Sequence, residues 1–163
     1  MKSRRRFNFR KIAGMAYIVA FLTYCIIGLQ PAGAHEYEIS GSLNIPSINL
    51  VSDVTTLKLE DHKLATPETI VGSYSRYDSK IFLIGHSTTV FKNLDQIRTG
   101  DTIYYNSKEY TVIGTKTLKK ENIDMDEILG RESSNTLIIM TCAGKILDGG
   151  DATHRFIVTA TEN

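Results

Sequence analysis

Apolar and polar residues follow two different patterns along this chain. From Ile12 to Leu29 every residue is uncharged and most are apolar. Beyond His35 the apolar residues instead occur in short runs, which are bounded by proline, glycine, asparagine and serine. The first pattern is typical of a membrane-spanning helix, and the second is typical of a domain built from short strands.

The short runs beyond His35 predict an all-β domain. Residues 80–84 form an apolar run that ends at Gly85, and residues 136–141 form another. The remaining strand-like segments are 42–45 and 48–51 on either side of Pro46-Ser47, 55–59, a hairpin of 102–105 and 109–117 around 106–108, and 155–161. Many short strands with turn residues between them predict an antiparallel barrel or a sandwich. A closed barrel would leave no exposed sheet edge.

One or two short helices are predicted within this domain. Phe91, Leu94 and Ile97 have helical spacing, and Gly100 follows them. The segment 118–135 is polar and acidic, with one helical turn expected around residues 126–129. The predicted fold class is therefore all-β with one or two short helices.

The N-terminal segment predicts attachment to a membrane. Residues 1–11 hold six basic residues and no acidic one, and residues 12–29 follow as the apolar run. Eighteen helical residues rise about 27 Å, close to the hydrocarbon thickness of a bilayer. Because basic flanks stay on the cytoplasmic side, the rest of the chain is expected outside the cytoplasm, held by a single pass through the cell membrane. The expected divisions are a cytoplasmic tail at 1–11, an anchor at 12–29, a linker at 30–42 and a folded domain at 43–163.

A cleaved signal peptide is the alternative interpretation of this segment. Residues 32–34 read Ala-Gly-Ala, which a signal peptidase would cut after Ala34. The apolar run is longer than the roughly 7–15 residues of a signal-peptide core. The uncleaved anchor is therefore favoured, and export is expected on either interpretation.

Charge and cysteine content narrow the function of the exported part. Residues 35–163 carry 13 basic and 18 acidic residues, a net charge of −5. This balance argues against nucleic acid or anionic lipid as a partner of the domain. Cys142 is its single cysteine, since Cys25 lies in the apolar run. Exported proteins usually pair their cysteines, so a lone thiol indicates a reactive role.

Three reactive side chains fall at the ends of predicted strands. Cys142 follows the run at 136–141, and Arg155 opens the next strand. If these two strands pair antiparallel, Cys142 and Arg155 become neighbours. His86 follows Gly85 at the end of the strand at 80–84. Strand ends of one sheet are a rigid support for a site.

The chemistry of this trio fits a cysteine nucleophile. A thiol with an ordinary pKa is mostly protonated at neutral pH and needs a basic or cationic neighbour. His86 would take the proton during attack and return it to a leaving amine. Arg155, always charged, would stabilise the thiolate and then the oxyanion of a tetrahedral intermediate.

The sequence resembles the sortase family over residues 43–161. The resemblance is carried by Thr141-Cys142, by the arginine that follows after twelve intervening residues and opens Arg-Phe-Ile-Val-Thr-Ala, by Gly85-His86, and by Ile45-Pro46-Ser47-Ile48. Where the family usually has Thr-Leu-x-Thr-Cys, this chain has Ile138-Ile139-Met140-Thr141-Cys142, so the outer positions differ. The resemblance implies a closed eight-stranded barrel with Cys142 as nucleophile, His86 as proton partner and Arg155 as oxyanion clamp.

The same resemblance implies a transpeptidase. Members cleave an LPxTG-like C-terminal sorting signal on a secreted protein, hold the acyl chain as a thioester, and pass it to an amine on a cell-wall precursor or a pilin lysine. Thr141, Ile123 and Ile128 are the implied substrate contacts. The short segment between Ala34 and Leu43 lacks an aromatic lid of the pilin-polymerising type, which favours a wall-anchoring or housekeeping role. No cofactor is expected for the chemistry.

Some sortases bind calcium through acidic residues in the loop before the nucleophile's strand. The acidic residues here are Glu121, Asp124, Asp126 and Glu127. Their spacing is not diagnostic of a calcium site, and a solvated acidic surface is the favoured interpretation.

Several alternatives stay open at this point. Cys142 would be a small buried hydrophobic residue in a non-catalytic, membrane-anchored binding module. Arg155 would be a surface ion pair with Asp148 or Asp151. His154 is a rival base, but neighbouring strand residues face opposite sides, so it is expected to point away from the thiol. An exported cysteine peptidase acting mainly by hydrolysis is the remaining enzymatic alternative.

Overall fold

A computed structural model describes residues 37–61, 63–76, 80–130, 135–148 and 151–163 of the 163-residue chain. The expected cytoplasmic tail, the anchor at 12–29, the cleavage point after Ala34 and the start of the linker lie outside the described residues. Within the described ranges, no helix is both long and apolar enough to cross a membrane.

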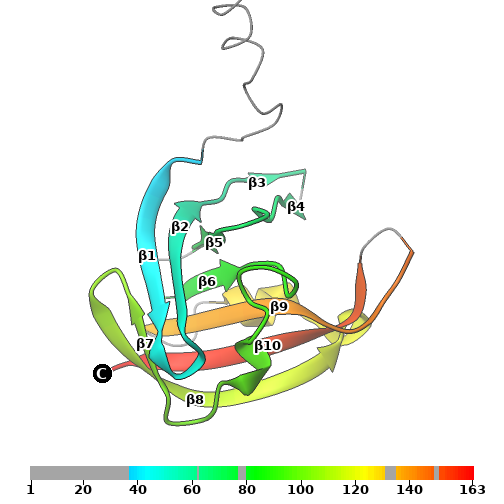
Figure 1. Ribbon diagram of the computed structural model, residues 1–163. Helices are drawn as coiled ribbons and strands as arrows, with labels where there is room; N and C mark the ends of the chain where they lie inside the picture. Colours follow the sequence, from blue (N-terminus) through cyan, green and yellow to red (C-terminus); the bar gives the residue numbers. More distant parts are fainter. Residues whose placement is uncertain (1–36, 62, 77–79, 131–134, 149–150) are drawn as a thin grey trace, which may run out of the picture. The chain divides into compact units, whose positions relative to one another are not determined.

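Eight strands close into a barrel (Figure 1). Their order around the barrel is β1-β2-β5-β6-β9-β10-β8-β7, and β7 pairs back onto β1. The strands are β1 Ile39–Ile45, β2 Leu50–Thr56, β5 Val71–Tyr74, β6 Lys80–Ile84, β7 Thr102–Tyr105, β8 Lys108–Lys119, β9 Thr136–Ile146 and β10 Ala152–Glu162. A separate two-stranded ribbon joins β3 Leu59–Glu60 to β4 Lys63–Leu64. The expected all-β, eight-stranded closed barrel is confirmed.

The strand pattern had led us to expect an antiparallel barrel, but the barrel contains two parallel strand pairs. β2 pairs parallel with β5, and β6 pairs parallel with β9. Parallel neighbours need a connection that crosses from one end of the sheet to the other. The segment between β2 and β5 makes that crossing and carries the β3–β4 ribbon. The segment between β6 and β9 is longer and carries β7, β8 and all the described helical segments except the one between β1 and β2.

The helical segments are short. Among the described residues they are the 3₁₀ turns η1 Pro46–Ile48, η2 Leu94–Gln96 and η3 Lys120–Asn122, and one α-helix, α2 Met125–Leu129. Where a helix was expected between residues 90 and 97, the chain forms turns and η2, and its three apolar residues are buried. The expected helical turn near residues 126–129 is α2, whose N-terminal amides bond to the carboxylate of Asp124.

Apolar side chains are buried on both faces of the central strands. Leu83 of β6 and Ile139 of β9 point into the barrel, where they join the main core. Phe82, Ile84 and Ile138 alternate with them and face outward, where Ile128 of α2 covers them. Burial on both faces explains why these strands read as continuous apolar runs rather than as alternating ones.

β9 and β10 continue beyond the body of the barrel as a hairpin arm (Figure 1). The pairing continues from Arg155 opposite Cys142 to His154 opposite Ala143, and resumes at Ala152 opposite Ile146 after a break in register. The sequence had indicated that Cys142 and Arg155 lie at strand ends. In the structure both lie inside their strands. The apolar run stops at Met140 because the arm has no core to cover, so hydrophobicity alone could not mark its length.

β1 also begins earlier than the hydrophobic pattern indicated. It starts at Ile39, within the segment expected to be a linker, and Ile39 pairs with Thr55. Ile39 is 51% exposed, and the first fully buried side chain of the strand is Leu43. The pattern gave no sign of the first three residues of the strand, because the core begins only at Leu43.

Candidate active site

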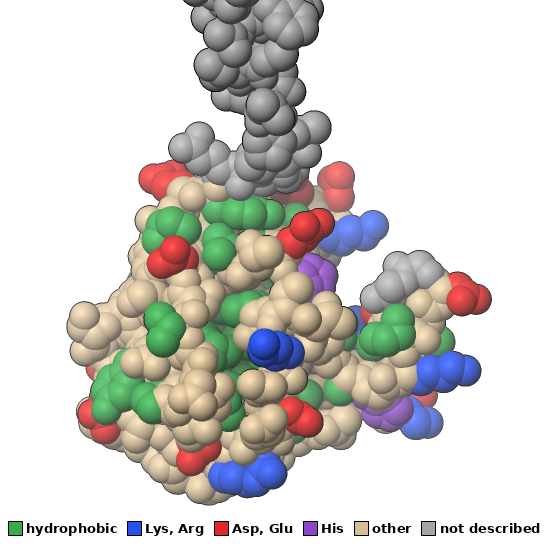
Figure 2. All heavy atoms as spheres, in the orientation of Figure 1, with side chains coloured by type: hydrophobic (Ala, Val, Ile, Leu, Met, Phe, Trp, Pro, Cys, Tyr) green, Lys and Arg blue, Asp and Glu red, His purple; other side chains and the backbone are tan. Residues whose placement is uncertain are grey.

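A groove of about 570 Å³ crosses one side of the barrel and contains the three reactive residues. Its polar lining includes Cys142, His86 and Arg155. The remaining lining residues are mostly apolar: Leu59, Leu64, Thr66, Tyr74, Arg76, Phe82, Ile84, Gly85, Met125, Asp126, Leu129, Met140 and Thr141. The surface is hollowed between the body of the barrel and the arm (Figure 2).

Cys142 and Arg155 are direct partners in the β9–β10 ladder. Residues opposite each other in an antiparallel pair project their side chains to the same face of the sheet. The thiol of Cys142 is free and half-buried, and the side chain of Arg155 is 15% exposed. The pairing thus places a thiol and a guanidinium on the same wall of the groove.

His86 reaches the same groove from the neighbouring strand. β6 and β9 run parallel, with Ile84 opposite Met140. The hydroxyl of Thr141 extends this contact by one residue, donating a 2.8 Å hydrogen bond to the carbonyl oxygen of Gly85. His86 and Cys142 follow these two joined residues, so the parallel register brings them to the same end of the sheet.

The turn after β6 fixes the backbone of His86. Its carbonyl oxygen accepts hydrogen bonds from the amides of Thr89 at 3.3 Å and Phe91 at 3.0 Å. In the described part of the chain, no hydrogen bond joins the imidazole to another group. The described residues therefore give the ring no carboxylate or carbonyl partner of the kind that orients the histidine of a three-residue triad.

Gly85 permits this approach because it has no side chain. A Cβ atom at this position would lie 2.6 Å from Cγ1 of Val90 and 2.8 Å from Cδ2 of Phe91. Phe91 is only 1% exposed and belongs to the main core, so it cannot easily move away. The glycine before His86 is thus required by packing of the turn onto the barrel.

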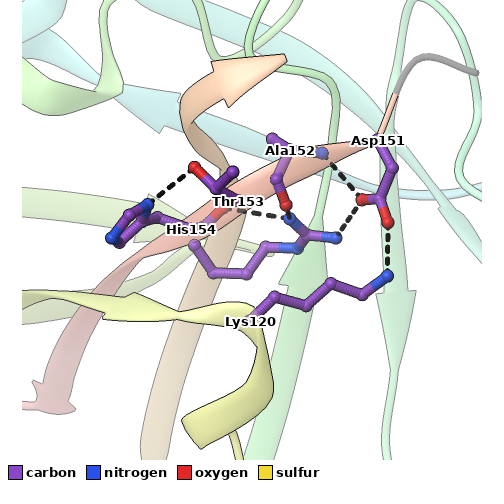
Figure 3. Close-up of polar contacts among 6 residues, drawn as sticks. Lys120, Asp151, Ala152, Thr153 and His154 are labelled. Atoms are coloured by element: carbon purple, nitrogen blue, oxygen red, sulfur yellow. Dashed lines mark hydrogen bonds and ion pairs between the residues drawn. The ribbon is translucent and has the colours of Figure 1, made fainter. Parts of the chain in front are cut away.

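Arg155 is held in place by three hydrogen bonds (Figure 3). Nη1 donates to the carbonyl oxygens of Ala152 and His154, each at 2.9 Å. Nη2 donates to Oδ1 of Asp151 at 2.7 Å. The ion pair with Asp151, one of the two partners considered from sequence, is therefore present, and Arg155 still lines the groove.

Asp151 lies between two cations (Figure 3). Its Oδ2 accepts a hydrogen bond from Nζ of Lys120, while Oδ1 also accepts from the amide of Ala152 at 2.8 Å. The hydrogen bond from Lys120, followed by those from Arg155 and from the Ala152 amide, lowers the pKa of Asp151 well below its usual value. The carboxylate is consequently ionised at any pH near neutrality.

His154 does not reach the groove. Its Nδ1 lies 2.8 Å from the hydroxyl of Thr153, and its ring lines a separate hollow with Lys119 and Leu147. In Figure 3 the imidazole points away from Asp151. Of the two neighbouring residues, Arg155 is thus the one on the thiol side.

The implied substrate contacts are only partly brought together. Thr141 lines the groove, although it is 6% exposed and its hydroxyl is bonded to Gly85. Ile123 and Ile128 do not line the groove. Ile128 is 8% exposed and packs from α2 onto the outer face of the barrel, and Ile123 borders a separate depression.

Met125 and Leu129 supply this wall of the groove instead. Their spacing of four residues places them on one face of α2, and Ile128 occupies the face turned to the barrel. That spacing was visible in the sequence. Which face meets the sheet was not, because both faces of this short helix carry apolar residues.

The acidic run is engaged in local contacts. Asp124 caps α2, Asp126 forms a 2.6 Å ion pair with Arg76, and Glu121 lies 3.6 Å from Lys119. Among the residues that the structure describes, no three histidine, cysteine or acidic side chains are grouped so as to hold a metal ion.

The arrangement has the parts that acyl transfer through a thioester requires. A free thiol, an imidazole and a charged guanidinium lie around one groove, and the apolar lining would bury an extended peptide beside them. Nη2 and Nε of Arg155 each keep one N–H without a partner among the described residues. These N–H groups are available to an oxyanion.

Comparisons with known proteins agree with this fold. The family model of the sortase domain matches residues 43–163. Sortase A of Corynebacterium diphtheriae, solved as a lid mutant, has 20% sequence identity and a TM-score of 0.61, over 80% of this chain and 73% of that one. Sortase A of Listeria monocytogenes has 20% identity and a TM-score of 0.58, over 77% and 87%. A sortase of Actinomyces oris has 17% identity and a TM-score of 0.59, over 82% and 83%. No curated protein sequence matches the chain.

Proposed function

This chain belongs to the sortase family, and we propose that it is a cysteine transpeptidase that cleaves an LPxTG-like sorting signal and transfers the protein to an amine. The observation that carries the proposal is the meeting of Cys142, His86 and Arg155 at one groove, with Cys142 and Arg155 paired across β9 and β10. The proposed nucleophile is Cys142, the proton partner is His86, and the oxyanion clamp is Arg155.

In the first half-reaction, the sulfur of Cys142 attacks the carbonyl carbon of the scissile peptide bond. The thiol proton passes to His86, and a C–S bond forms while negative charge develops on the carbonyl oxygen. The two N–H groups of Arg155 that bond to no described residue would hydrogen-bond to this oxygen. When the C–N bond breaks, His86 returns its proton to the leaving amine, and a thioester on Cys142 remains.

In the second half-reaction, the acceptor amine attacks the thioester carbon. His86 takes a proton from this amine, the C–S bond breaks, and Cys142 leaves as the thiolate that is reprotonated for the next cycle. The acceptor we propose is an amine at the cell surface, such as a cell-wall precursor or a pilin lysine. The thiol, imidazole and guanidinium supply all the chemistry, so the proposed reaction calls for no cofactor.

The apolar part of the groove is the proposed binding place for the signal. Met125 and Leu129 on one side and Phe82 and Ile84 beneath them would hold its apolar side chain. We further propose that the substrates are secreted proteins and that residues 12–29 keep the enzyme in the membrane, because their length and apolarity match a bilayer.

Mass spectrometry of the full-length protein tests this function. The purified chain is mixed with a panel of LPxTG-like peptides, with and without an oligoglycine amine. We expect a thioester adduct on Cys142 that the amine converts to a ligated product. Cys142→Ala is the control and is expected to give neither species.

The possible results separate the three functions considered. An adduct that is hydrolysed and never ligated would indicate a cysteine peptidase acting by hydrolysis. Failure of every peptide, together with a thiol inert to methanethiosulfonate, would indicate a binding module with a buried cysteine. The second measurement matters because a reactive thiol without a peptide adduct would show that the panel lacked the right signal.

Arg155→Lys tests the clamp separately from the nucleophile. Lysine keeps the positive charge but lacks the planar set of donors that contacts Ala152, His154 and Asp151 together. Loss of an oxyanion donor slows acyl transfer by about 10²–10³-fold in comparable sites. We expect a loss of this size in thioester formation, and full activity of Arg155→Lys would rule out the clamp.

A further inference from the structure

We propose that Asp151 is a positioning residue for Arg155 and that, through Lys120, it connects the oxyanion clamp to the segment forming one wall of the groove. This inference rests on the proposed transpeptidase function and deepens it. The contacts that carry it are the ion pairs on the two oxygens of Asp151 (Figure 3).

The hydrogen bonds of Arg155 show how Asp151 helps to hold its guanidinium group in place. The carbonyl oxygens of Ala152 and His154 both accept from Nη1, so together they fix one corner of the guanidinium. Asp151 contacts a second corner, Nη2. Two fixed corners set the plane of the group, and with it the direction of the remaining N–H groups on Nη2 and Nε. Without Asp151 the group would be held at Nη1 alone, and Nη2 would lose its one bonded partner among the described residues.

Asp151 is itself well fixed. The amide of Ala152 donates to Oδ1 at 2.8 Å, and the ammonium of Lys120 bonds to Oδ2. These donors and Arg155 keep the pKa of the carboxyl low, so its charge persists through the neutral range. A charged acceptor makes a stronger and shorter bond to a guanidinium than a neutral one does.

Lys120 brings a second part of the protein to this carboxylate. It opens η3, which follows β8 and leads directly to α2. Met125 and Leu129 of α2 line the groove. The path from the groove wall to the clamp therefore runs through η3, Lys120 and Asp151, and a peptide that contacts α2 acts on the same segment that holds Asp151.

A double-mutant cycle on the full-length chain tests the inference. Asp151→Asn, Arg155→Ala and the double variant are compared with wild type in single-turnover thioester formation, using the peptide that gives an adduct. We expect Asp151→Asn to slow the chemical step by between about tenfold and a hundredfold, as misplacement of a catalytic group does. The peptide concentration giving half-maximal rate should change by less than about twofold, since Asp151 does not line the groove.

The decisive comparison is made without the guanidinium. If Asp151 acts through Arg155, then Asp151→Asn costs no further rate in the Arg155→Ala background. An equal loss in both backgrounds, or a wild-type rate for Asp151→Asn, would overturn the inference. Asp151→Glu keeps the charge and should recover part of the rate, whereas a purely structural loss would not depend on charge.

Further variants guard against a fold defect and a mistaken premise. Asp148→Asn, on the same arm and exposed, is the matched control and should behave as wild type. Lys120→Met leaves Asp151 intact and should give a smaller loss, and it replaces Asp151→Asn in the cycle if that variant does not fold. A wild-type chain that forms no thioester would overturn the proposed function. If the wild type is active and Asp151→Asn forms the thioester at the wild-type rate, only this inference is overturned.

Discussion

The hydroxyl of Thr141 donates a hydrogen bond to the carbonyl oxygen of Gly85, 2.8 Å away and 56 residues earlier in the chain. This contact joins the residue before the proposed nucleophile to the residue before the proposed proton partner. It lies in a buried position where two strands run parallel. The distance between the thiol and the imidazole therefore depends on one side-chain hydrogen bond as well as on strand pairing.

Thr141→Val should lower both stability and activity. Valine has nearly the shape of threonine but leaves the buried carbonyl of Gly85 without this donor, which costs about 1–3 kcal/mol. Thermal unfolding and the rate of thioester formation are the measurements. Thr141→Ser retains the hydroxyl and should stay close to wild type in both. Unchanged stability and rate in Thr141→Val would show that the contact does not hold the site together.

Gly85→Ala should disturb the position of His86. The added Cβ would meet Val90 and Phe91 at less than 3 Å, and overpacking of this kind costs about 1–3 kcal/mol. We expect a lower melting temperature and a slower acylation step. Gly114→Ala is a matched control in β8, because a Cβ there has no atom within 4 Å. Wild-type behaviour of Gly85→Ala would contradict the packing argument.

The contribution of Asp151 to stability should depend on pH in one direction. Its pKa in the folded protein is lowered from its usual value of 3.8, chiefly by Lys120 and then by Arg155. A lowered pKa stabilises the folded state above the unfolded pKa, and that contribution fades as pH falls toward the folded value. The melting-temperature difference between wild type and Asp151→Asn should thus be constant above about pH 5 and shrink below about pH 4.

Thermal scans between neutral and acidic pH measure this difference. Asp148→Asn is the companion control, since Asp148 forms no ion pair with another described residue and its difference from wild type should stay small throughout. A difference for Asp151→Asn that grew on acidification would have the wrong sign for a carboxylate stabilised by cations.

Two neighbouring residues of α2 should separate binding from folding. Leu129 lines the groove, and Ile128 is buried against the barrel. Leu129→Ala should weaken binding of the peptide's apolar residue with a small change in melting temperature. Ile128→Ala should lower the free energy of unfolding by about 2–5 kcal/mol and leave the peptide concentration for half-maximal rate nearly unchanged. The reverse result would assign the groove wall to the wrong face of the helix.

The strands that could be predicted from the sequence are those whose side chains are buried, because burial produces a recognisable run of apolar residues. β6 and the first part of β9 are apolar on both faces, so they were recognised as strands. The turn of the β7–β8 hairpin was also recognised, and Asn106 and Ser107 adopt φ values of 48° and 66° there. Asparagine and serine favour such turns because their short polar side chains compete for backbone hydrogen bonds.

Other elements could not be predicted because their structure depends on distant parts of the chain. β5, which reads Val71-Gly72-Ser73-Tyr74, has no apolar periodicity and becomes a strand only between β2 and β6. The arm of β9 passes through Gly144 at a φ of 76°, a residue that normally ends a strand prediction. The bond from Thr141 to Gly85 requires the parallel register of β6 and β9, which no local pattern specifies.

The reactive residues of the site could be predicted from their types, but the residues that hold them in place could be identified only in the structure. Cys142, His86 and Arg155 were identified as candidates from their types and from a family resemblance. From the sequence, Asp151 was considered only as an ion-pair partner that would hold Arg155 at the surface. In the structure it bonds to both Arg155 and Lys120. Met125 and Leu129 were missed because the apolar faces of a five-residue helix look alike in sequence.

The parallel pairing of β6 with β9 also has a consequence for the newly made chain. Closing a loop of this size is costly in entropy, and contacts between distant segments form late in folding. Before that pairing forms, Cys142 can already face Arg155 across the β9–β10 hairpin, but His86 is not yet beside it, because it follows β6. The proposed proton partner thus reaches the proposed nucleophile only when the barrel closes, so a chain that has not finished folding lacks the complete proposed site.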